Sequence, residues 1–313
     1  MRFSIAIPAY KSKFLQECIT SVLAQSYDDY ELIIVNDASP ERIDEIVSSF
    51  KDQRIKYYTN KENYGAVNLV DNWNKCLQYA SGDFFICIGD DDKLLPNCLE
   101  EYNKLISDYP DLNIFHGWTE IINENSEIIT MQEPRPLTEC VYSMMWNRWK
   151  YRNQFIGDFL FRTDALKSIG GFYKIPLAWG SDDITSYIIA KDKGIANTQT
   201  PVFQYRRNSY TISSVGNSEW KLIALKEDYI WSKEFLKNPP SDMISKVYWD
   251  NLCTMAYPRY QRRKRNTLEK DIINGGYKRL AFWFRKKKKY DINNILLLKL
   301  LIFYFKNKTK NLI

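Results

Sequence analysis

The sequence predicts an α/β fold in which helices flank a parallel sheet, and two observations support this class. Short runs of aromatic and β-branched residues alternate with segments whose apolar side chains recur at helical spacing. The connections between the apolar runs are about a dozen residues or longer, which is the length that a crossover between parallel strands needs. A chain of 313 residues has room for one such domain of about 200–230 residues and a smaller appendage.

The predicted elements follow this alternation in order. Strands are expected at the apolar runs of residues 3–8, 30–35, 55–58, 84–88 and 114–118. Helices are expected where apolar residues are spaced three or four apart, over residues 15–23, 43–50, 67–79 and 219–237. A polar loop precedes the third helix and ends in Gly65, a residue typical of turns.

Carboxylates follow two of the predicted strands. The second strand runs into Asp37, and the fourth ends at Gly89, which is followed by Asp90, Asp91 and Asp92. The carboxyl ends of parallel strands meet at the edge where open α/β sheets bind ligands. Two carboxylates about 6 Å apart at an effective dielectric near 20 repel by roughly 2–3 kcal/mol, so three in a row favour a cation. Mg²⁺ or Mn²⁺ would suit these oxygen ligands, and the alternative is a solvated acidic turn that caps the next helix.

The charge of the chain is divided unevenly. The net charge is +6, but residues 259–310 contain 17 Lys and Arg against 3 Asp and Glu, a net of +14, whereas the rest carries 27 against 35, a net of −8. The two parts therefore need different partners. In the basic part, aromatic residues lie between the positive charges, and the apolar run 295–305 follows. Eleven helical residues span about 16 Å, roughly half of a bilayer core, so this run cannot cross a membrane.

This composition predicts a membrane-surface element that binds an anionic bilayer, and the alternative is a helical cap packed on the main domain. Nucleic acid is not expected as a partner, because no nucleic-acid-binding fold is recognisable. The six cysteines lack metal-type spacing and several lie in apolar stretches, so we expect reduced residues of a cytoplasmic protein. The chain opens directly into a strand without the features of a signal peptide, so the mature chain is expected to start at the sheet.

Four short motifs lie at the ends of the predicted strands. They are Ile5-Ala6-Ile7-Pro8-Ala9-Tyr10, Val35-Asn36-Asp37-Ala38-Ser39, Asn63-Tyr64-Gly65, and Gly89-Asp90-Asp91-Asp92 with Leu95-Pro96. Their order, spacing and context resemble glycosyltransferase family 2 over about residues 1–215. The resemblance implies a GT-A fold, a Rossmann-like nucleotide-binding mixed sheet flanked by helices, here with a helical, basic C-terminal extension. It also implies a nucleotide-diphosphate sugar donor and inverting transfer with a divalent metal.

The resemblance assigns roles to the residues of these motifs. The donor nucleotide is expected to contact Pro8, Ala9, Tyr10, Asp37, Asn63 and Gly65. Asp37 would accept a hydrogen bond from the base. Asp91 would hold the metal on the diphosphate, with Asp92 beside it and Asp90 near the ribose. Many members of the family have an acid at the position of Gly89, which is a departure in this chain.

Further along the chain, Gly170-Gly171-Phe172 resembles the turn that precedes the family's acceptor site. Ser181-Asp182-Asp183 follows it, and taken alone this run would be a helix N-cap with acids in the first turn. Its place matches the family's Glu-Asp site, whose aspartate is the general base, so Asp182 is the expected base and Asp183 the reserve. Residues 146–152 could stack on a sugar ring or form a surface helix. Arg206 is expected to pair with the diphosphate or with an anionic acceptor.

The sequence therefore predicts an inverting glycosyltransferase that uses Mn²⁺ or Mg²⁺, with residues 1–215 as its catalytic domain and 216–313 as a helical membrane-surface region. The expected donor is a UDP-sugar, and the expected acceptor is a hydroxyl of a glycan or lipid-linked glycan in a polysaccharide or glycolipid precursor. We expect a cytoplasmic protein, peripheral on the inner face of the membrane. A nucleotide-binding protein without turnover and a metal-dependent phosphotransferase are the alternatives.

Overall fold

The computed structural model describes residues 1–208 and 217–310, with side chains as far as Lys306, and its N-terminal part has the predicted alternation of strands and helices. The strands are β1 (Phe3–Ala9), β2 (Tyr30–Asn36), β3 (Ile55–Thr59) and β4 (Phe84–Cys87). The helices are α1 (Leu15–Leu23), α2 (Ile43–Ser49) and α3 (Leu69–Tyr79), the last preceded by the 3₁₀ turn η1 (Ala66–Asn68). The expected bounds of these elements are therefore close to the observed ones.

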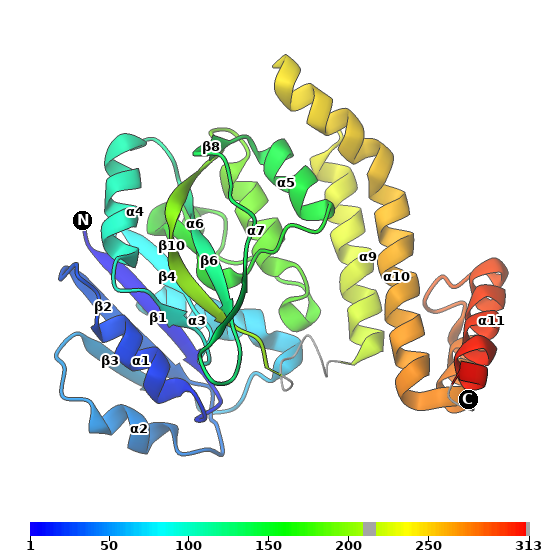
Figure 1. The fold of residues 1–313 in the computed structure, drawn as a ribbon, viewed down its shortest axis with the longest axis horizontal. Coiled ribbons are helices and arrows are strands. Elements are labelled where there is room, and N and C mark those ends of the chain that lie inside the picture. Colours follow the sequence, from blue (N-terminus) through cyan, green and yellow to red (C-terminus); the bar gives the residue numbers. More distant parts are fainter. Residues whose placement is uncertain (209–216, 311–313) are drawn as a thin grey trace.

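The remaining elements complete the sheet and add three long helices. The other strands are β5 (Lys93–Leu94), β6 (Ile114–Ile122), β7 (Ile128–Met131), β8 (Thr138–Glu139), β9 (Phe159–Arg162) and β10 (Ile195–Arg206). Between them lie α4 (Cys98–Asp108), α5 (Val141–Trp149), η2 (Ile156–Asp158), α6 (Thr163–Ser168), η3 (Pro176–Ala178) and α7 (Ser181–Ala190). The helices α9 (Ser218–Phe235), α10 (Met243–Lys286) and α11 (Asn294–Lys310) follow, on one side of the sheet domain (Figure 1).

The sheet is mixed, as the GT-A resemblance implies. Its strand order is β3-β2-β1-β4-β9-β6-β10-β5. Strands β1 to β4 are parallel, as the alternation of strands and helices predicts. Strand β9 lies between β4 and β6 and is antiparallel to both, so the sheet as a whole is not parallel. The parallel half brings the carboxyl ends of β1, β2 and β4 to a common edge.

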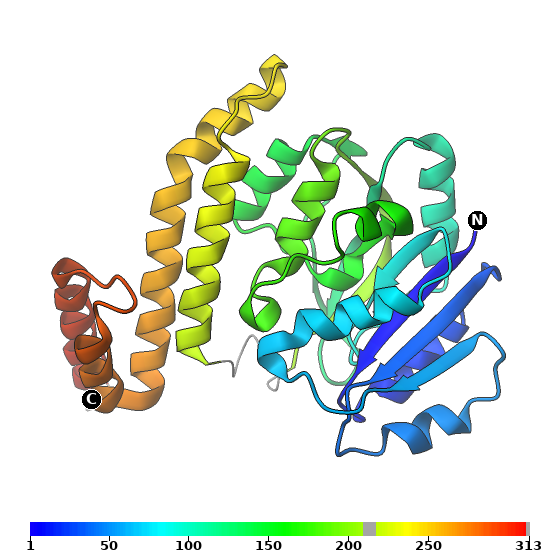
Figure 2. The same ribbon diagram turned by 180° about the vertical axis from the view of Figure 1, so that it is seen from behind.

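The central strands β1, β2 and β4 are buried on both faces, which explains why they are mostly apolar. Ile5 and Ile7 of β1 pack with α1, α2 and α4 on one face, whereas Ala6 packs with α3 and α5 on the other. Figure 2 shows α3, in cyan, crossing this second face. Side chains of a strand alternate between the two faces, so a strand covered on both is mostly apolar, and a polar side chain in it, such as Glu31 of β2, needs partners within the protein.

The C-terminal helices pack on the sheet domain and on one another. Leu252 and Ala256 of α10 belong to the same core cluster as α3 and α5. Asp228 of α9 accepts hydrogen bonds from Arg259 and Arg263 of α10, each at 2.7 Å. Part of the basic region therefore acts as a helical cap, which was the alternative to membrane binding. No helix in the described part of the chain is long and apolar enough to cross a membrane.

A buried carboxylate joins the strands at the edge of the sheet opposite to the acidic motif. Glu31 accepts hydrogen bonds from Ser4 Oγ at 2.6 Å and Ser81 N at 2.7 Å, and Lys56 Nζ lies 2.5 Å from its other oxygen. Burial favours the neutral acid and raises the pKa of Glu31, but these donors outweigh it and lower the pKa to about 2. Glu31 thus stabilises the folded state in its ionised form.

We expect Glu31→Gln to lower the free energy of unfolding at pH 7 by roughly 3 kcal/mol, because the folded-state pKa lies about two units below the unfolded one. A carboxyl with a lowered folded-state pKa stabilises fully above its unfolded pKa, and this contribution is lost as the pH falls towards 2. Urea unfolding at pH 7 and at pH 3 measures the difference, which should shrink at pH 3. Glu45→Gln, at an exposed position of α2, is the control. An equal loss at both pH values would contradict the assignment.

Candidate active site

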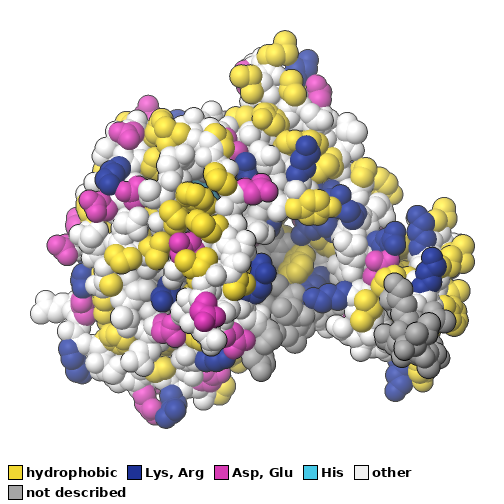
Figure 3. Space-filling view, in the orientation of Figure 1, with side chains coloured by type: hydrophobic (Ala, Val, Ile, Leu, Met, Phe, Trp, Pro, Cys, Tyr) yellow, Lys and Arg dark blue, Asp and Glu magenta, His cyan; other side chains and the backbone are white. Residues whose placement is uncertain are grey.

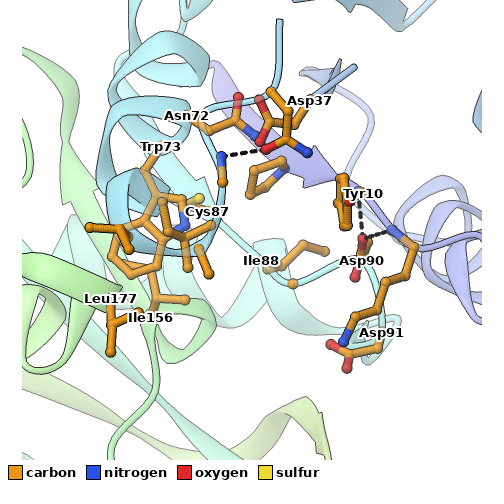
Figure 4. A pocket seen from close by; sticks show the side chains of 18 of the residues that line it. Tyr10, Asp37, Asn72, Trp73, Cys87, Ile88, Asp90, Asp91, Ile156 and Leu177 are labelled. Carbon is orange, nitrogen blue, oxygen red and sulfur yellow. Dashed lines mark hydrogen bonds between the residues drawn. The ribbon is translucent and has the colours of Figure 1, made fainter. Parts of the chain in front are cut away.

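A pocket of about 770 Å³ opens at the common edge of β1, β2 and β4 (Figure 4). Its lining includes eight residues predicted to bind the donor or the metal: Pro8, Tyr10, Asp37, Asn63, Gly65, Asp90, Asp91 and Asp92. Ala9 is buried at the end of β1 and contributes its carbonyl, which accepts a hydrogen bond from Asp37 N at 2.9 Å. The place at the carboxyl edge of the sheet is the usual place of a ligand site in α/β proteins.

Asp37 is held at the bottom of one end of the pocket. Its Oδ1 accepts hydrogen bonds from Asn60 Nδ2 at 2.9 Å and from Tyr64 N at 3.1 Å. Within the described residues no hydrogen bond to Oδ2 is formed, so this oxygen is available to a donor on a ligand. Gly65 lines the same end with a φ of 72°, a value that glycine adopts without strain.

The three aspartates after β4 are fixed by different parts of the chain. Asp90 Oδ2 accepts hydrogen bonds from the amides of Tyr10 and Lys11, each at 2.7 Å. Asp91 Oδ2 accepts one from Asn208 Nδ2 at 2.6 Å. Asp92 Oδ1 accepts one from the amide of Arg206 at 2.9 Å. The acidic turn is thereby tied both to the end of β1 and to the end of β10.

The space around Gly89 explains why a residue without a side chain suits this position of the turn. A Cβ atom at this position would lie 2.8 Å from Asp92 Oδ2 and 2.9 Å from Asp91 Oδ1. An acidic side chain, as many family members have here, would need the side chains of Asp91 and Asp92 to move. In this chain the negative charge of the turn comes from the three carboxylates that follow Gly89.

Burial raises the pKa of all three aspartates. The pKa of Asp90 is raised to about 6, first by burial and then by the charge of Asp91. Burial is also the main cause for Asp91 and Asp92, and the charge of Asp91 adds to it at Asp92. A nearby cation would reverse these shifts, because it stabilises the ionised carboxylates.

The donor set fits a divalent cation that shares its coordination with a ligand. Hard carboxylate oxygens suit Mg²⁺ and Mn²⁺. Among residues 1–208 and 217–310, no group of three or more His, Cys, Asp and Glu side chains is arranged to hold a metal by itself. Asp91 and Asp92 would therefore hold the ion together with phosphate oxygens and water, which is common for Mg²⁺.

Arg206 was predicted to pair with the diphosphate or with an anionic acceptor, but its side chain does not line the pocket. Its side chain is fully buried outside the pocket and stacks on Phe14, with 4.2 Å between guanidinium and ring centre. Nε donates to Asp91 O at 2.8 Å, Nη1 donates to Asn123 O at 3.1 Å, and Nη2 lies 3.0 Å from Glu17 Oε2. Arg206 therefore supports the acidic turn from behind, since β10 ends beside that turn rather than above the pocket.

The two aspartates at the start of α7 lie in different environments. Asp183 is buried, and its carboxylate accepts hydrogen bonds from Arg148 Nε and Gln154 Nε2, each at 2.9 Å. Asp182 is partly exposed and makes no side-chain hydrogen bond or ion pair with a described residue. Burial, and then the charge of Asp183, raise the pKa of Asp182 to about 7, and Arg148 opposes this shift. Asp182 is thus the carboxylate available to take a proton.

Asp182 and Asp183 do not line the pocket in its described form, but Tyr205 connects the two places. Tyr205 lines the pocket, and its pKa is raised by burial, by Asp92 and Asp91, and also by Asp182. The charges of the acidic turn and of Asp182 therefore both act on the same side chain of the pocket wall.

The pocket also has an apolar end that the sequence did not predict. Figure 4 shows Trp73, Ile156 and Leu177 together at this end, away from Asp37 and Tyr10. Trp73 lies on the apolar face of α3, where its helical spacing indicates a core residue and nothing more. Leu177 has a φ of 62°, unusual for a residue with a Cβ, and such strain is often found at ligand sites. Residues 146–152 do not line the pocket, and α5 covers the sheet there.

The protein belongs to glycosyltransferase family 2. The family model described as glycosyl transferase family 2 matches residues 4–170, which is more than half of the chain. The matched residues contain all four motifs, the fourth of which is the acidic turn. The chain is therefore a glycosyltransferase with a GT-A fold.

Three known proteins illustrate this relationship. The chain is 28% identical over 250 residues to the Escherichia coli UDP-Glc:alpha-D-GlcNAc-diphosphoundecaprenol beta-1,3-glucosyltransferase WfgD, covering 79% of this chain and 89% of the relative. The structure of this chain is similar to that of S. aureus TarS 1-349 in complex with UDP-GlcNAc. The TM-score is 0.65 and the identity 15%, and the match covers 98% of this chain and 92% of the TarS chain. The mannosyltransferase PcManGT from Pyrobaculum calidifontis, in complex with GDP-Man and Mn²⁺, has a TM-score of 0.55, 16% identity, and coverage of 98% and 86%. At these identities the two structures show the fold alone.

We expect Asp182→Asn to reduce turnover about 10²–10⁴-fold with little effect on donor binding, because the amide cannot take the acceptor proton. The base acts when it is deprotonated, so kcat/KM of the unchanged protein should fall about tenfold per pH unit below pH 7 and level off above it. Sugar transfer between about pH 5.5 and pH 9 measures both effects.

Asp183→Asn is the matched control, and it should lower the melting temperature because Arg148 loses its buried partner. If a folded Asp183→Asn protein is inactive while Asp182→Asn turns over normally, Asp183 is the base. Normal turnover of both variants would remove this segment from the acceptor site.

Proposed function

We propose that this glycosyltransferase transfers a sugar, with inversion, from a UDP-sugar to a hydroxyl group of a lipid-linked glycan in a polysaccharide or glycolipid precursor. The proposal includes Mn²⁺ or Mg²⁺ as the cofactor. The observation that carries it is the shared edge of the sheet, where Asp37 at one end of the pocket and the acidic turn at the other are both fixed by backbone amides.

The pocket supports binding of a nucleotide diphosphate along its length. Asp37 lines the pocket, and its Oδ2 would accept a hydrogen bond from the base, as the N–H of a pyrimidine such as uracil offers one. Tyr10 and Gly65 would border the base and ribose, and Asp90 supports the end of β1 beneath them. Asp91 and Asp92 would hold the metal, which would neutralise the charge that develops on the leaving diphosphate.

The protein's own part in the reaction is to position the acceptor and to remove its proton. Asp182 accepts the proton of the attacking hydroxyl, and its pKa near 7 suits this task at neutral pH. Arg148 holds Asp183 and thereby keeps the first turn of α7 in place. Trp73, Leu177 and the partly exposed Trp220 give the pocket apolar walls on which a sugar ring can pack.

The acceptor class is proposed from the relative WfgD, whose name states a diphosphoundecaprenol-linked GlcNAc acceptor. The alignment with that relative covers 89% of the relative's own length and 79% of this chain. A lipid-linked acceptor places the enzyme at a membrane surface, and the six free cysteines support a reducing compartment such as the cytoplasm.

Asp91→Asn should weaken the Mn²⁺-dependent binding of UDP at least tenfold, because it removes a charged oxygen from the metal site. Calorimetry of UDP binding with Mn²⁺ and with EDTA measures this. Asp83→Asn, an exposed aspartate just before β4, is the control and should bind as the unchanged protein does. Unchanged affinity in Asp91→Asn would remove Asp91 from the metal site. Binding without sugar transfer to any lipid-linked glycan would instead favour a nucleotide-binding protein without turnover.

A further inference from the structure

The exposed side of α11 carries an apolar stripe. Ile295, Leu298 and Ile302 are 68%, 57% and 47% exposed. Their spacing of three and four residues places them on one face of the helix. The opposite face, with Leu296, Leu297 and Leu300, is buried against α9 and α10. The helix is therefore apolar on the side that packs and also on the side that does not.

A basic groove borders this stripe. A hollow of about 580 Å³ between α10 and α11 is lined by Arg262, Arg265, Lys299 and, in its wall, Ile295. A second hollow of about 470 Å³, at the turn between the two helices, is lined by Lys287 and Lys288 and shares Asn293 with the first. Figure 3 shows Lys and Arg side chains beside hydrophobic ones on these helices.

The acids of the groove are already neutralised. Glu269 lies 2.6 Å from Arg265, and Asp291 lies 2.8 Å from Lys226 of α9. Among the side chains described as far as Lys306, no ion pair is formed by Lys288 or Lys299. The groove therefore keeps an excess of positive charge on its open side, next to the apolar stripe.

We propose that the stripe and the groove together form a docking surface for an anionic lipid bilayer. The apolar side chains would enter the boundary between headgroups and acyl chains, and the groove would receive lipid phosphates. Charge decides between the possible occupants, because residues 259–310 carry a net charge of +14 and two copies of this surface would repel each other. Nucleic acid would pair with the lysines but would leave the stripe in water.

The docking surface is coupled to the active-site pocket through α9. Tyr290, in the turn between α10 and α11, donates a hydrogen bond to Glu219 of α9, and Lys226 pairs with Asp291 in the same turn. Trp220 and Asn217, at the start of α9, line the pocket. A bilayer bound at α11 would thus be connected through α9 to the side of the pocket that Trp220 lines, and we expect a lipid-linked acceptor to enter from this side. Only this last step rests on the proposed function.

The test is cosedimentation of the full-length protein with vesicles of phosphatidylcholine alone or of an equal mixture with phosphatidylglycerol. The unchanged protein should bind the mixed vesicles at low salt and bind them less at high salt. It should not sediment with the neutral vesicles. Ile295→Asp/Leu298→Asp should lower the affinity at least tenfold. The matched control is Ile244→Asp/Val247→Asp, on the first turns of α10, whose residues are 72% and 54% exposed with the same spacing.

Charge is tested in the same way with Lys288→Glu/Lys299→Glu, which should also lower the affinity at least tenfold. Lys51→Glu/Lys61→Glu, on the surface of the sheet domain, gives the same change in net charge and should retain binding. Melting temperature and UDP binding should be unchanged in all four variants, which separates a failed docking surface from a failed donor site.

Three results would overturn the proposal. The unchanged protein could fail to bind mixed vesicles at low salt. The stripe variant could bind them as well as its control does. Finally, the stripe variant could lose an oligomer, seen by light scattering, while vesicle binding stays the same, which would assign the stripe to a second copy of the chain.

Discussion

The site depends on the turn after β4, which holds three adjacent carboxylates at a partly buried edge. Backbone amides of Tyr10, Lys11 and Arg206 fix two of them, and the guanidinium of Arg206 binds the carbonyl of Asp91. Amide donors orient a carboxylate without cancelling its charge, so the turn keeps negative charge that burial makes unfavourable. A cation with its own anionic ligand offsets this charge. The fold therefore leaves negative charge at the edge of the sheet, and a metal-bound nucleotide diphosphate would stabilise it.

The start of α7 shows the opposite arrangement of two adjacent carboxylates. Arg148 and Gln154 engage Asp183, which becomes a structural anchor for the helix. Asp182 has no such partner in the described part of the chain, and burial together with the charge of Asp183 raises its pKa to about 7. Environments that treat neighbouring acids differently are a common way to separate structural and chemical roles. The sequence shows two adjacent aspartates, but it does not show which of them pairs with Arg148.

The strands β1, β2 and β4 and the edge that holds the acidic turn were predictable, because these strands are mostly apolar and are followed by polar residues at the same edge. The role of Arg206 was not predictable, since its position behind the acidic turn depends on β10 pairing with β6 and β5, which is a long-range contact. Trp73 was missed for a related reason, because helical spacing places it on the apolar face of α3 without showing that this face reaches the pocket. The antiparallel pairing of β9 could not be predicted either, because a short apolar run does not indicate in which direction the strand pairs with its neighbours.

The C-terminal helices use their positive charge in two ways: some of the basic side chains hold the helices together, and others lie on the proposed docking surface. Arg259 and Arg263 point inward to Asp228, where they bind α10 to α9. Lysines nearer the C-terminus border the exposed stripe of α11 instead. The inward arginines join α10 to α9, and the turn before α11 bonds to α9 through Tyr290 and Asp291. The start of α9 lines the pocket, so the same helix contacts both the active site and the turn that leads to the docking surface. A connection of this kind would let one surface bind a bilayer while the pocket receives an acceptor anchored in it.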